Sequence, residues 1–579
     1  MQLNMKTFNR LIAYLWRYKK SSTIAILFIL LSSVTATVIP LMARYYIDTY
    51  IDNGVWNEGY WILIVYYSLF LLRVLLTYIG TYAFSYVSNS VVRDLRQEAF
   101  TNMQKLNMTY FDTTPAGAIV SRLTNDTQAV SDMFSSIFST FLSTLFIVVA
   151  TLSAMFSMNV GLTILMVLFI PVMFASVKIY NHLSHSVIRK TREKLSEINV
   201  KLAESIDGMK MIQAFNQEER LRREFEQINE EHVQFSNRSI NVNSLFLRPA
   251  MSLLKLVAYA VIILYFGLTW EVAGVTAGVM YAFIQFSNQL FNPLIDVTQN
   301  FAIIQTSMIA ATRVFEVIDN TDYEPDQLGK VTEIKNGKIE FRNVSFSYDG
   351  KRNVLKNINF VVNPGETVAF VGSTGSGKSS IMNLFLRFYD FKEGEILIDE
   401  LPIQQYSQEV LRNKIGLVLQ DPFLFHGTVA SNIRMYQDIT DEEVKQACEF
   451  VDAHHFIEQL PQGYDHKVSE KGSTFSSGER QLIAFARTIA ANPKILILDE
   501  ATANIDSQTE EVIQTSLKKM RNGRTTLAIA HRLSTIQDAN QIFVLDKGEI
   551  VENGTHTELL EKEGLYYKMY QLQAGMMQD

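Results

Sequence analysis

The chain has 579 residues, of which 48% are hydrophobic and only 19% are charged. This length exceeds what one hydrophobic core normally organises, so we expect two or more domains. A formal net charge of −7 argues against a nucleic-acid-binding surface, and no nucleic-acid partner is expected. The single cysteine, Cys448, excludes an internal disulfide framework and a cysteine-based metal cluster.

The long apolar runs lie in the first part of the chain. A helix needs about 20 apolar residues to cross the hydrocarbon of a bilayer. The uncharged stretch Met133–Val177 is long enough for two such helices, with a polar turn at residues 157–161. Together with four further runs it predicts six membrane spans. The further runs are Thr23–Ala43, residues 60–86, Leu256–Trp270 and Val272–Ile295.

The distribution of Lys and Arg predicts how these spans are oriented. The connection between residues 46 and 60 contains neither, and the turns near Asn159 and Glu271 also lack them. Basic residues instead precede the first span and follow the second and the fourth. We therefore expect the N-terminus, the long connections 88–132 and 178–248, and the C-terminal half to be cytoplasmic. The chain is predicted to be a multi-pass protein of the cell membrane, surrounded by membrane lipid.

Arg73, Lys255 and Asp296 are ionisable residues within or close to the predicted spans. A charge inside a bilayer is costly, so each is a functional candidate. They could line a polar cavity, or pair with one another or with a partner chain. Lys255 and Asp296 could instead lie in water, if the helices continue beyond the membrane.

The sequence becomes polar after Asp319, and we assign residues 320–337 to a linker. Residues 1–319 then form the transmembrane domain, with six spans and long cytoplasmic helical extensions. Residues 338–579 form a second domain, in which strand-like and helix-like runs alternate as in α/β proteins.

An eight-residue run in the second domain fits the phosphate-binding loop G-x-x-x-x-G-K-S/T at every defined position. It lies between the strand-like run Thr367–Val371 and the helix-like run Ile381–Phe388, which is the context that this motif requires. In such a loop, backbone N–H groups surround the phosphates, Lys378 reaches the β- and γ-phosphates, and Ser379 is placed to ligate Mg²⁺. ATP and Mg²⁺ are therefore the expected cofactors. The expected nucleotide-binding residues here are Gly372, Ser373, Thr374, Gly375, Ser376, Gly377, Lys378, Ser379 and Ser380.

A second apolar strand, Ile495–Leu498, ends in the two carboxylates Asp499 and Glu500. Asp499 is expected to hold Mg²⁺, and Glu500 to orient and deprotonate the attacking water. An apolar strand that ends in Asp-Glu is weak evidence alone. It gains weight because Ser476-Ser477-Gly478 lies about 20 residues before it, and because His531 follows Glu500 by 31 residues.

Together these motifs closely resemble those of ATP-binding-cassette (ABC) transporters, with the cassette C-terminal to six spans as in exporters. The resemblance covers nearly the whole chain. It implies a membrane all-α six-helix transmembrane domain followed by a cytoplasmic α/β P-loop ATPase domain. It also implies that Tyr348 stacks on adenine, that Gln420 links Mg²⁺ and the water to the membrane domain, and that His531 contacts the γ-phosphate. Coupling helices are expected at residues 108–112 and 205–214.

Members of this family close two cassettes face to face, so a chain with one cassette implies a second chain. The family signature is Leu-Ser-Gly-Gly-Gln, whereas residues 475–479 here read Phe-Ser-Ser-Gly-Glu. Ser476 and Gly478 can still offer a hydroxyl and an N–H to the partner's nucleotide. Ser477 adds a Cβ where glycine permits close approach, and Glu479 brings a carboxylate toward a polyphosphate. Alternatively, these changes are tolerated drift, because a carboxylate is favourable at a helix start.

This pattern resembles the catalytically intact half of bacterial heterodimeric multidrug exporters. It implies a non-identical partner with a consensus signature and an impaired catalytic carboxylate. The leading interpretation is a translocase that uses ATP hydrolysis to export amphipathic drugs or other hydrophobic compounds. A flippase for lipids or lipid-linked precursors would share the same motifs. A nucleotide-dependent sensor subunit is a further alternative, against which the intact Glu500 and His531 argue.

Overall fold

The computed structural model describes residues 5–246, 248–269, 276–435, 437–469, 472–499, 507–530, 533–573 and 575. The chain forms two compact units. The first comprises Met1–Gln104 and Ala116–Asn320, and the second comprises Lys105–Pro115 and Thr321–Asp579. The short segment Lys105–Pro115 thus belongs to the second unit, although helices of the first unit flank it in sequence.

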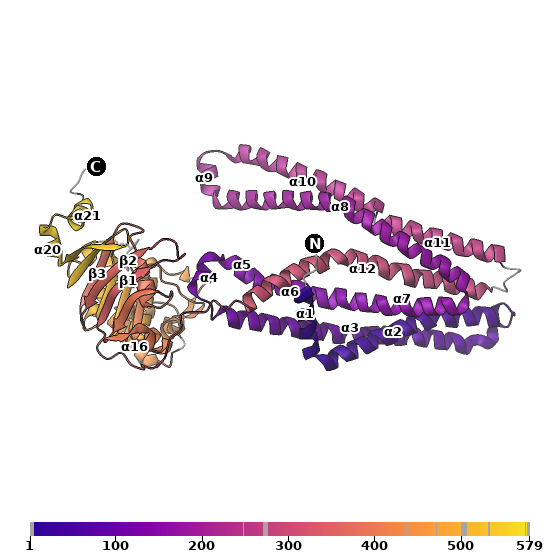
Figure 1. Ribbon diagram of the computed structural model, residues 1–579, viewed down its shortest axis with the longest axis horizontal. Helices are drawn as coiled ribbons and strands as arrows, with labels where there is room; N and C mark the ends of the chain where they lie inside the picture. Colours follow the sequence, from indigo (N-terminus) through magenta and orange to yellow (C-terminus); the bar gives the residue numbers. More distant parts are fainter. Residues whose placement is uncertain are drawn as a thin grey trace. The chain divides into compact units, whose positions relative to one another are not determined.

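The first unit consists of long helices in two groups (Figure 1). One group is a bundle of α2, α3, α7 and α12, and α8, α10 and α11 form the other. The bundle helices are α2 (Lys19–Tyr46), α3 (Tyr60–Met103), α7 (Ser139–Met158) and α12 (Ala277–Ile318). The second group consists of α8 (Val160–Asp207), α10 (Glu218–Phe246) and α11 (Arg248–Thr269), with α9 (Met209–Ala214) between α8 and α10. Shorter elements are α1 (Met5–Arg17), η1 (Ile47–Ile51), η2 (Trp56–Gly59), α5 (Ala116–Ser121), η3 (Arg122–Asp126), α6 (Thr127–Asp132) and η4 (Met133–Phe138).

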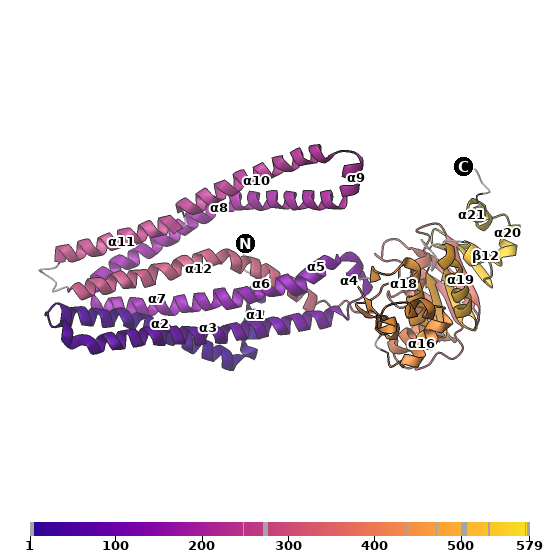
Figure 2. The ribbon, with the colours of Figure 1, turned by 180° about the vertical axis from the view of Figure 1, so that it is seen from behind.

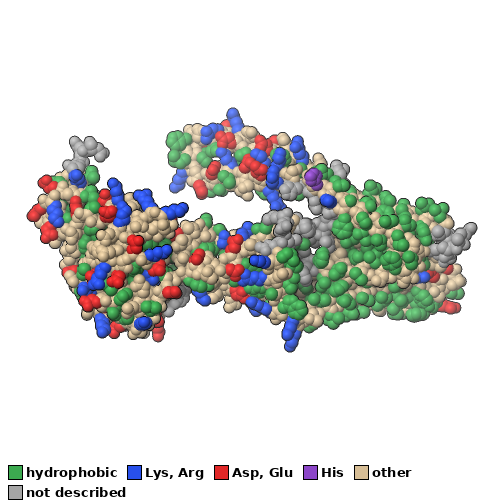
Figure 3. All heavy atoms as spheres, viewed as in Figure 1, with side chains coloured by type: hydrophobic (Ala, Val, Ile, Leu, Met, Phe, Trp, Pro, Cys, Tyr) green, Lys and Arg blue, Asp and Glu red, His purple; other side chains and the backbone are tan. Residues whose placement is uncertain are grey.

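Five helical stretches among the described residues are long and apolar enough to span a membrane. They are Lys19–Ile51, Trp56–Met103, Ala116–Met158, Val160–Asp207 and Pro249–Leu268. The sixth expected span, Val272–Ile295, is not one of these five. It begins outside the described residues, and its described part is the start of α12. The many amide side chains of α12 lower its hydropathy. In Figure 3, hydrophobic side chains cover one end of this unit, whereas charged side chains gather on α8 and α10.

The turn expected at residues 157–161 separates α7 from α8. Asn159 begins α8 as its N-cap, and its side-chain oxygen accepts a hydrogen bond from the Leu162 N–H at 2.9 Å. Such a cap satisfies one of the N–H groups that a helix start leaves without a partner. The long uncharged stretch is thereby divided into two helices.

The second unit is built on a six-stranded sheet with the order β12-β11-β3-β10-β9-β6, in which only the edge strand β12 is antiparallel. The antiparallel sheet β2-β1-β4-β5 packs with α13 against one face, and α18 and α19 pack against the other (Figure 2). The strands are β1 (Ile339–Phe346), β2 (Leu355–Val362), β3 (Thr367–Gly372), β4 (Glu393–Ile398), β5 (Leu401–Pro402), β6 (Ile415–Val418), β7 (Gly427–Thr428), β8 (Lys467–Val468), β9 (Ile495–Asp499), β10 (Thr525–Ile529), β11 (Gln541–Asp546) and β12 (Glu549–Gly554). The helices are α4 (Met108–Thr113), α13 (Lys378–Phe385), α14 (Gln408–Lys414), α15 (Val429–Arg434), α16 (Asp441–Phe450), α17 (His454–Glu458), α18 (Ser477–Ala490), α19 (Ser507–Arg521), α20 (His556–Glu561) and α21 (Leu565–Gln573).

The central strands β3, β9 and β10 are apolar along their whole length because both faces of the sheet are covered. In β3, Val368 and Phe370 face the four-stranded sheet and α13, whereas Ala369 and Val371 face α18 and α19. The segment expected as a linker also packs on this unit, since the N–H groups of Leu328 and Lys330 donate to carbonyl oxygens of residues 404 and 405.

Candidate nucleotide site

The candidate phosphate loop joins the end of β3 to the start of α13, as its sequence context predicts. Gly375 and Gly377 have φ angles of 81° and 107°, a region that residues with a Cβ rarely adopt. A Cβ on Gly377 would also lie 2.7 Å from the Leu355 side chain. Ser373 and Thr374 are exposed beside Gly375. The two glycines therefore allow the tight curl that precedes the first turn of α13.

Lys378 is buried, and its side chain bonds to the backbone of this loop. Its ammonium group donates hydrogen bonds to the carbonyl oxygens of Gly372 and Ser373, at 2.7 and 3.0 Å. Ser376 is also buried, and its hydroxyl has no hydrogen-bond partner among the described residues. Ser379 is exposed in the first turn of α13. A lysine, an unpartnered hydroxyl and the N–H groups of a helix start fit a polyphosphate, and the exposed Ser379 hydroxyl fits Mg²⁺.

Tyr348 lies beside this loop with 43% of its surface exposed. Its hydroxyl donates a hydrogen bond to the Ser380 hydroxyl at 3.0 Å and accepts one from the Asn383 amide at 3.3 Å. Phe346 and Tyr389 pack against its ring in T-shaped arrangements, with centroids 4.7 and 4.9 Å away. The ring is thus held firmly while part of it stays open, which is what stacking on a base requires.

The expected Mg²⁺ ligands converge on the same edge of the sheet. Asp499 is the last residue of β9, and Gln420 is exposed two residues after β6, the strand beside β9. Because β6, β9, β10 and β3 are parallel, their carboxyl ends meet at one edge, together with the phosphate loop. Glu500 and His531 lie outside the described residues.

The candidate signature loop leads directly into α18. Ser476 is the N-cap, and its hydroxyl accepts a hydrogen bond from the Glu479 N–H at 3.2 Å. The Glu479 carboxylate in turn accepts one from the Ser476 N–H at 2.7 Å. This capping box gives Glu479 a local structural role, as the drift alternative expects. Ser477 and the buried Gly478 form the first turn of α18.

Two family models match separate parts of the chain. Residues 22–294 match the model described as ABC transporter transmembrane region, and residues 355–503 match the model described as ABC transporter. The chain belongs to the ABC transporter family. The predicted fold class is thereby confirmed, as is the predicted enzyme class, a translocase in which ATP hydrolysis is coupled to transport.

Similar proteins match this ABC transporter over nearly its full length. It is 57% identical over 571 residues to the ABC transporter ATP-binding protein designated exp8 of Streptococcus pneumoniae serotype 4, and this match covers 98% of each chain. It is 43% identical over 518 residues to the probable multidrug resistance ABC transporter ATP-binding/permease protein YheH of Bacillus subtilis, covering 89% of this chain and 77% of that protein. A solved bacterial Atm1-family ABC exporter with ATP bound has a TM-score of 0.78 and 28% identity, covering 96% of this chain and 98% of its own. The chain is accordingly a multi-pass membrane protein of the ABC exporter type.

The first expected coupling helix of the transporter is α4, which packs within the ATPase unit. The Asn107 N–H donates to the Asp322 carbonyl oxygen at 2.9 Å, and the Glu324 N–H donates to the Lys105 carbonyl oxygen at 3.0 Å. The Tyr389 hydroxyl donates a hydrogen bond to the carboxylate of Asp112. Burial and this bond raise the pKa of Tyr389. The ring of Tyr389 also packs on Tyr348, so α4 is linked to the expected adenine-binding side chain.

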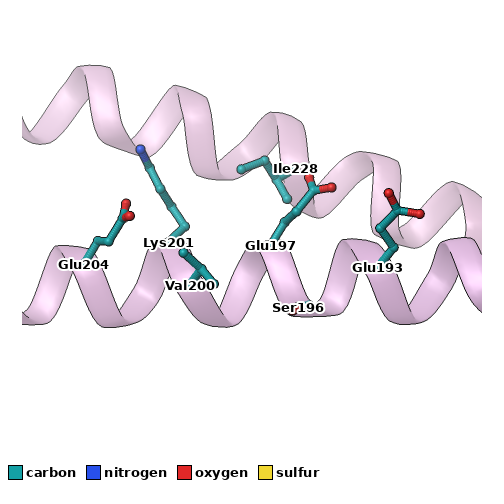
Figure 4. A pocket seen from close by; sticks show the side chains of 7 residues that line it. All are labelled: Glu193, Ser196, Glu197, Val200, Lys201, Glu204 and Ile228. Atoms are coloured by element: carbon teal, nitrogen blue, oxygen red, sulfur yellow. The ribbon is translucent and has the colours of Figure 1, made fainter. Parts of the chain in front are cut away.

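The second expected coupling helix lies at the tip of the α8–α10 hairpin of the transporter. Lys201 pairs with Glu224 at 2.5 Å and Lys194 with Glu231 at 2.8 Å, so α8 and α10 are held together. Figure 4 shows a hollow between these helices, lined by Glu193, Ser196, Glu197, Val200, Lys201, Glu204 and Ile228. Large apolar side chains are exposed at the tip, on and beside α9. They are Ile206, Met209, Met211 and Phe215.

The three ionisable candidates of the membrane unit have different surroundings. Arg73 lines a cavity between the bundle helices of the transporter. Lys255 is half-buried on α11, and Asp296 is exposed on α12. Neither of the latter two lines that cavity.

Sequence reasoning missed the polar side chains that share the cavity with Arg73. They are Gln285, Asn288, Gln289 and Asn292. Their positions i, i+3, i+4 and i+7 place them on one face of a helix, and this spacing is a signal that the sequence contains. The role of Tyr389 has no comparable signal, because its partner in α4 is remote in sequence.

Proposed function

We propose that this chain is the catalytically intact half of a heterodimeric exporter that moves amphipathic drugs or other hydrophobic compounds across the cell membrane. The proposal rests on a difference between the two nucleotide sites to which this chain contributes. The elements for the chain's own nucleotide follow the family pattern, whereas Ser477 and Glu479 depart from it in the loop that serves the partner's nucleotide. The partner would carry a consensus signature and an impaired catalytic carboxylate.

The exposed apolar tip around α9 supports a second chain. Among the described residues of its own unit, nothing covers Ile206, Met211 or Phe215, whose exposed fractions are 61 to 70%. An apolar patch of this kind suits a protein interface. In the proposed dimer this tip would dock on the partner's cassette, and α4 on its own.

The chemistry would be phosphoryl transfer to water. Lys378 and the N–H groups of the phosphate loop bind the β- and γ-phosphates, and Tyr348 stacks on the base. Ser379, Gln420 and Asp499 would hold Mg²⁺, which neutralises charge on the phosphates. From the family resemblance, Glu500 orients and deprotonates the water and His531 contacts the γ-phosphate. The partner's signature loop completes this site.

Transport would follow from two states of the dimer. ATP between the cassettes favours the closed, outward-facing arrangement, and product release favours the inward-facing one, because each state makes different nucleotide contacts. The N-terminus and the cassette would face the cytoplasm, as the arrangement of basic residues predicts.

The decisive experiment compares the chain alone with the complex that it forms in its native membrane. We expect the complex to hydrolyse ATP faster when amphipathic dyes or drugs are added, and to pump them into inverted vesicles. Glu500→Gln in this chain should preserve ATP binding and abolish turnover. Full transport-coupled ATPase activity of the chain alone, as a homodimer, would contradict the heterodimer. Absence of any cargo-stimulated ATPase in the intact complex would contradict export.

A further inference from the structure

A polar cavity of about 360 Å³ lies within the membrane unit, among α2, α3, α7 and α12. Its apolar wall includes Ala36 and Ile39 of α2 and Ile147 of α7. Arg73 of α3 and a polar face of α12 complete the lining, and no acidic side chain contributes to it within the described residues. The cavity is at the small end of the range for ligand sites, which suits a head group and a short apolar stem.

Arg73 is a charge without a counter-ion in this cavity. Its guanidinium is half-buried and forms no hydrogen bond or ion pair with the described part of the chain. It lies about 20 Å along α3 from the helix start at Tyr60, well within the thickness of a bilayer. Charged side chains at such depth are costly and normally face a partner or a water-filled cavity. The structure therefore provides a strong site for a negative charge.

The polar face of α12 divides into bonded and available groups. Asn288 accepts a hydrogen bond from the Tyr259 hydroxyl at 2.5 Å, and Gln289 donates one to the Ala36 carbonyl oxygen at 2.8 Å. Gln285 and Asn292 line the cavity without a side-chain hydrogen bond to any described residue. They lie about 12 and 22 Å along α12 from its start and line the same cavity as Arg73. Their amide N–H groups are thus additional donors for an anion.

We propose that this cavity binds the anionic group, a carboxylate or a phosphate, of an amphipathic ligand. Arg73 is the counter-ion, the amides of Gln285 and Asn292 donate to the same group, and the apolar stem lies against α2 and α7. The proposal rests on the proposed function in that the ligand would be a cargo of the exporter. An Arg guanidinium suits both anions because its planar fork matches two oxygens at once.

The test measures ligand affinity without nucleotide. The complex of this chain with its partner is placed in nanodiscs of zwitterionic lipid and titrated with three probes. The probes share one dansyl-labelled undecyl chain and end in a carboxylate, a phosphate monoester or an uncharged methyl ester. We expect the wild-type complex to bind both acids at least ~10-fold more tightly than the ester, the effect of a hydrogen-bonded charge.

Substitutions then assign that preference to its residue. Arg73→Gln should abolish the preference for the acids and leave the ester affinity unchanged, which also shows that the complex is folded. Arg73→Lys should keep most of the preference, because the charge remains. Lys255→Gln, a half-buried base outside the cavity, should change none of the affinities. Tighter binding of the phosphate probe would indicate a phospholipid-like ligand. Equal or tighter binding of the carboxylate probe would indicate an acidic drug-like ligand.

Two results would overturn the anion site. They are equal binding of acid and ester by the wild type, and an acid preference that survives Arg73→Gln. If the wild type shows no acid preference and Arg73→Gln also loses the complex, Arg73 pairs with the partner chain instead. If only neutral amphiphiles stimulate the ATPase, the proposed anion site is wrong and the proposed export function still holds. If the complex prefers the acids but no amphiphile stimulates its ATPase, the proposed export function is wrong and the anion site still holds.

Discussion

The Tyr389 hydroxyl donates a hydrogen bond to the carboxylate of Asp112 in α4, and the ring of Tyr389 packs edge-on against Tyr348. One side chain therefore contacts both a candidate coupling helix and the candidate adenine-stacking ring. Movement of Tyr348 when a base stacks on it would reach α4 through a single intervening residue.

Tyr389→Phe should separate nucleotide binding from coupling. The phenyl ring keeps its packing on Tyr348 but cannot donate to Asp112, so ATP affinity should change less than about 2-fold. Cargo stimulation of ATPase should fall about 5-fold, the equivalent of one hydrogen bond of ~1 kcal/mol. Asp112→Ala is the matched control on the other side of the bond, because it removes the acceptor, and it should have a similar effect. A normal stimulated rate in both variants would leave this contact without a role in coupling.

Gly377→Ala should damage the phosphate loop. Its φ of 107° and the 2.7 Å approach of a Cβ to Leu355 force the loop to shift, so we expect ATP affinity to fall at least ~10-fold. Gly375 has φ of 81° but open space around its missing side chain. Gly375→Ala should therefore weaken binding less. Equilibrium binding of a fluorescent ATP analogue to the purified protein measures both, and the reverse order would contradict this view of the loop.

The two roles of Glu479 can be separated by substitution. Glu479→Gln retains the capping box with Ser476 and removes only the charge that favours a helix start, so stability should fall by no more than roughly 0.5 kcal/mol. If the carboxylate also repels the partner's nucleotide, the affinity of that site for ATP should rise. Glu479→Ala removes the reciprocal bond and should lower stability by about 1 kcal/mol. Thermal unfolding and ATP-binding measurements on the complex distinguish these outcomes, and equal ATP affinities of the wild type and the Glu479→Gln variant would support drift.

Gln289 satisfies a carbonyl that Pro40 leaves without a partner. Pro40 has no N–H for the Ala36 oxygen four residues earlier, and the Gln289 amide donates to that oxygen at 2.8 Å. Gln289→Leu should destabilise the membrane unit by about 1–3 kcal/mol, because a buried carbonyl would remain unpaired. In a Pro40→Ala background, where the helical N–H returns, the same substitution should cost much less. A double-mutant cycle of thermal stability in detergent measures the difference, and strict additivity would contradict this pairing.

Much of the candidate nucleotide site was predictable because its interactions are local. The bonds from Lys378 reach carbonyl oxygens only five and six residues away, and the strand and helix on either side were visible as apolar runs. The Ser476 and Glu479 capping box likewise follows from a three-residue spacing. Motifs of this kind encode their geometry in consecutive residues. The roles given to Gln420, Glu500 and His531 stay predictions from the family pattern.

The sequence by itself determined the family and the fold class and indicated a candidate phosphate loop, since these depend on short motifs and on the lengths of apolar runs. It also placed the four amides of α12 on one face. Only the tertiary structure decided which residues that face contacts. Gln289 contacts Ala36 across 253 residues, and Tyr389 contacts Asp112 across 277. No local rule specifies such pairs, because the packing of whole helices and strands brings them together. The cavity at Arg73 likewise depends on tertiary structure, since four helices far apart in sequence enclose this one charge.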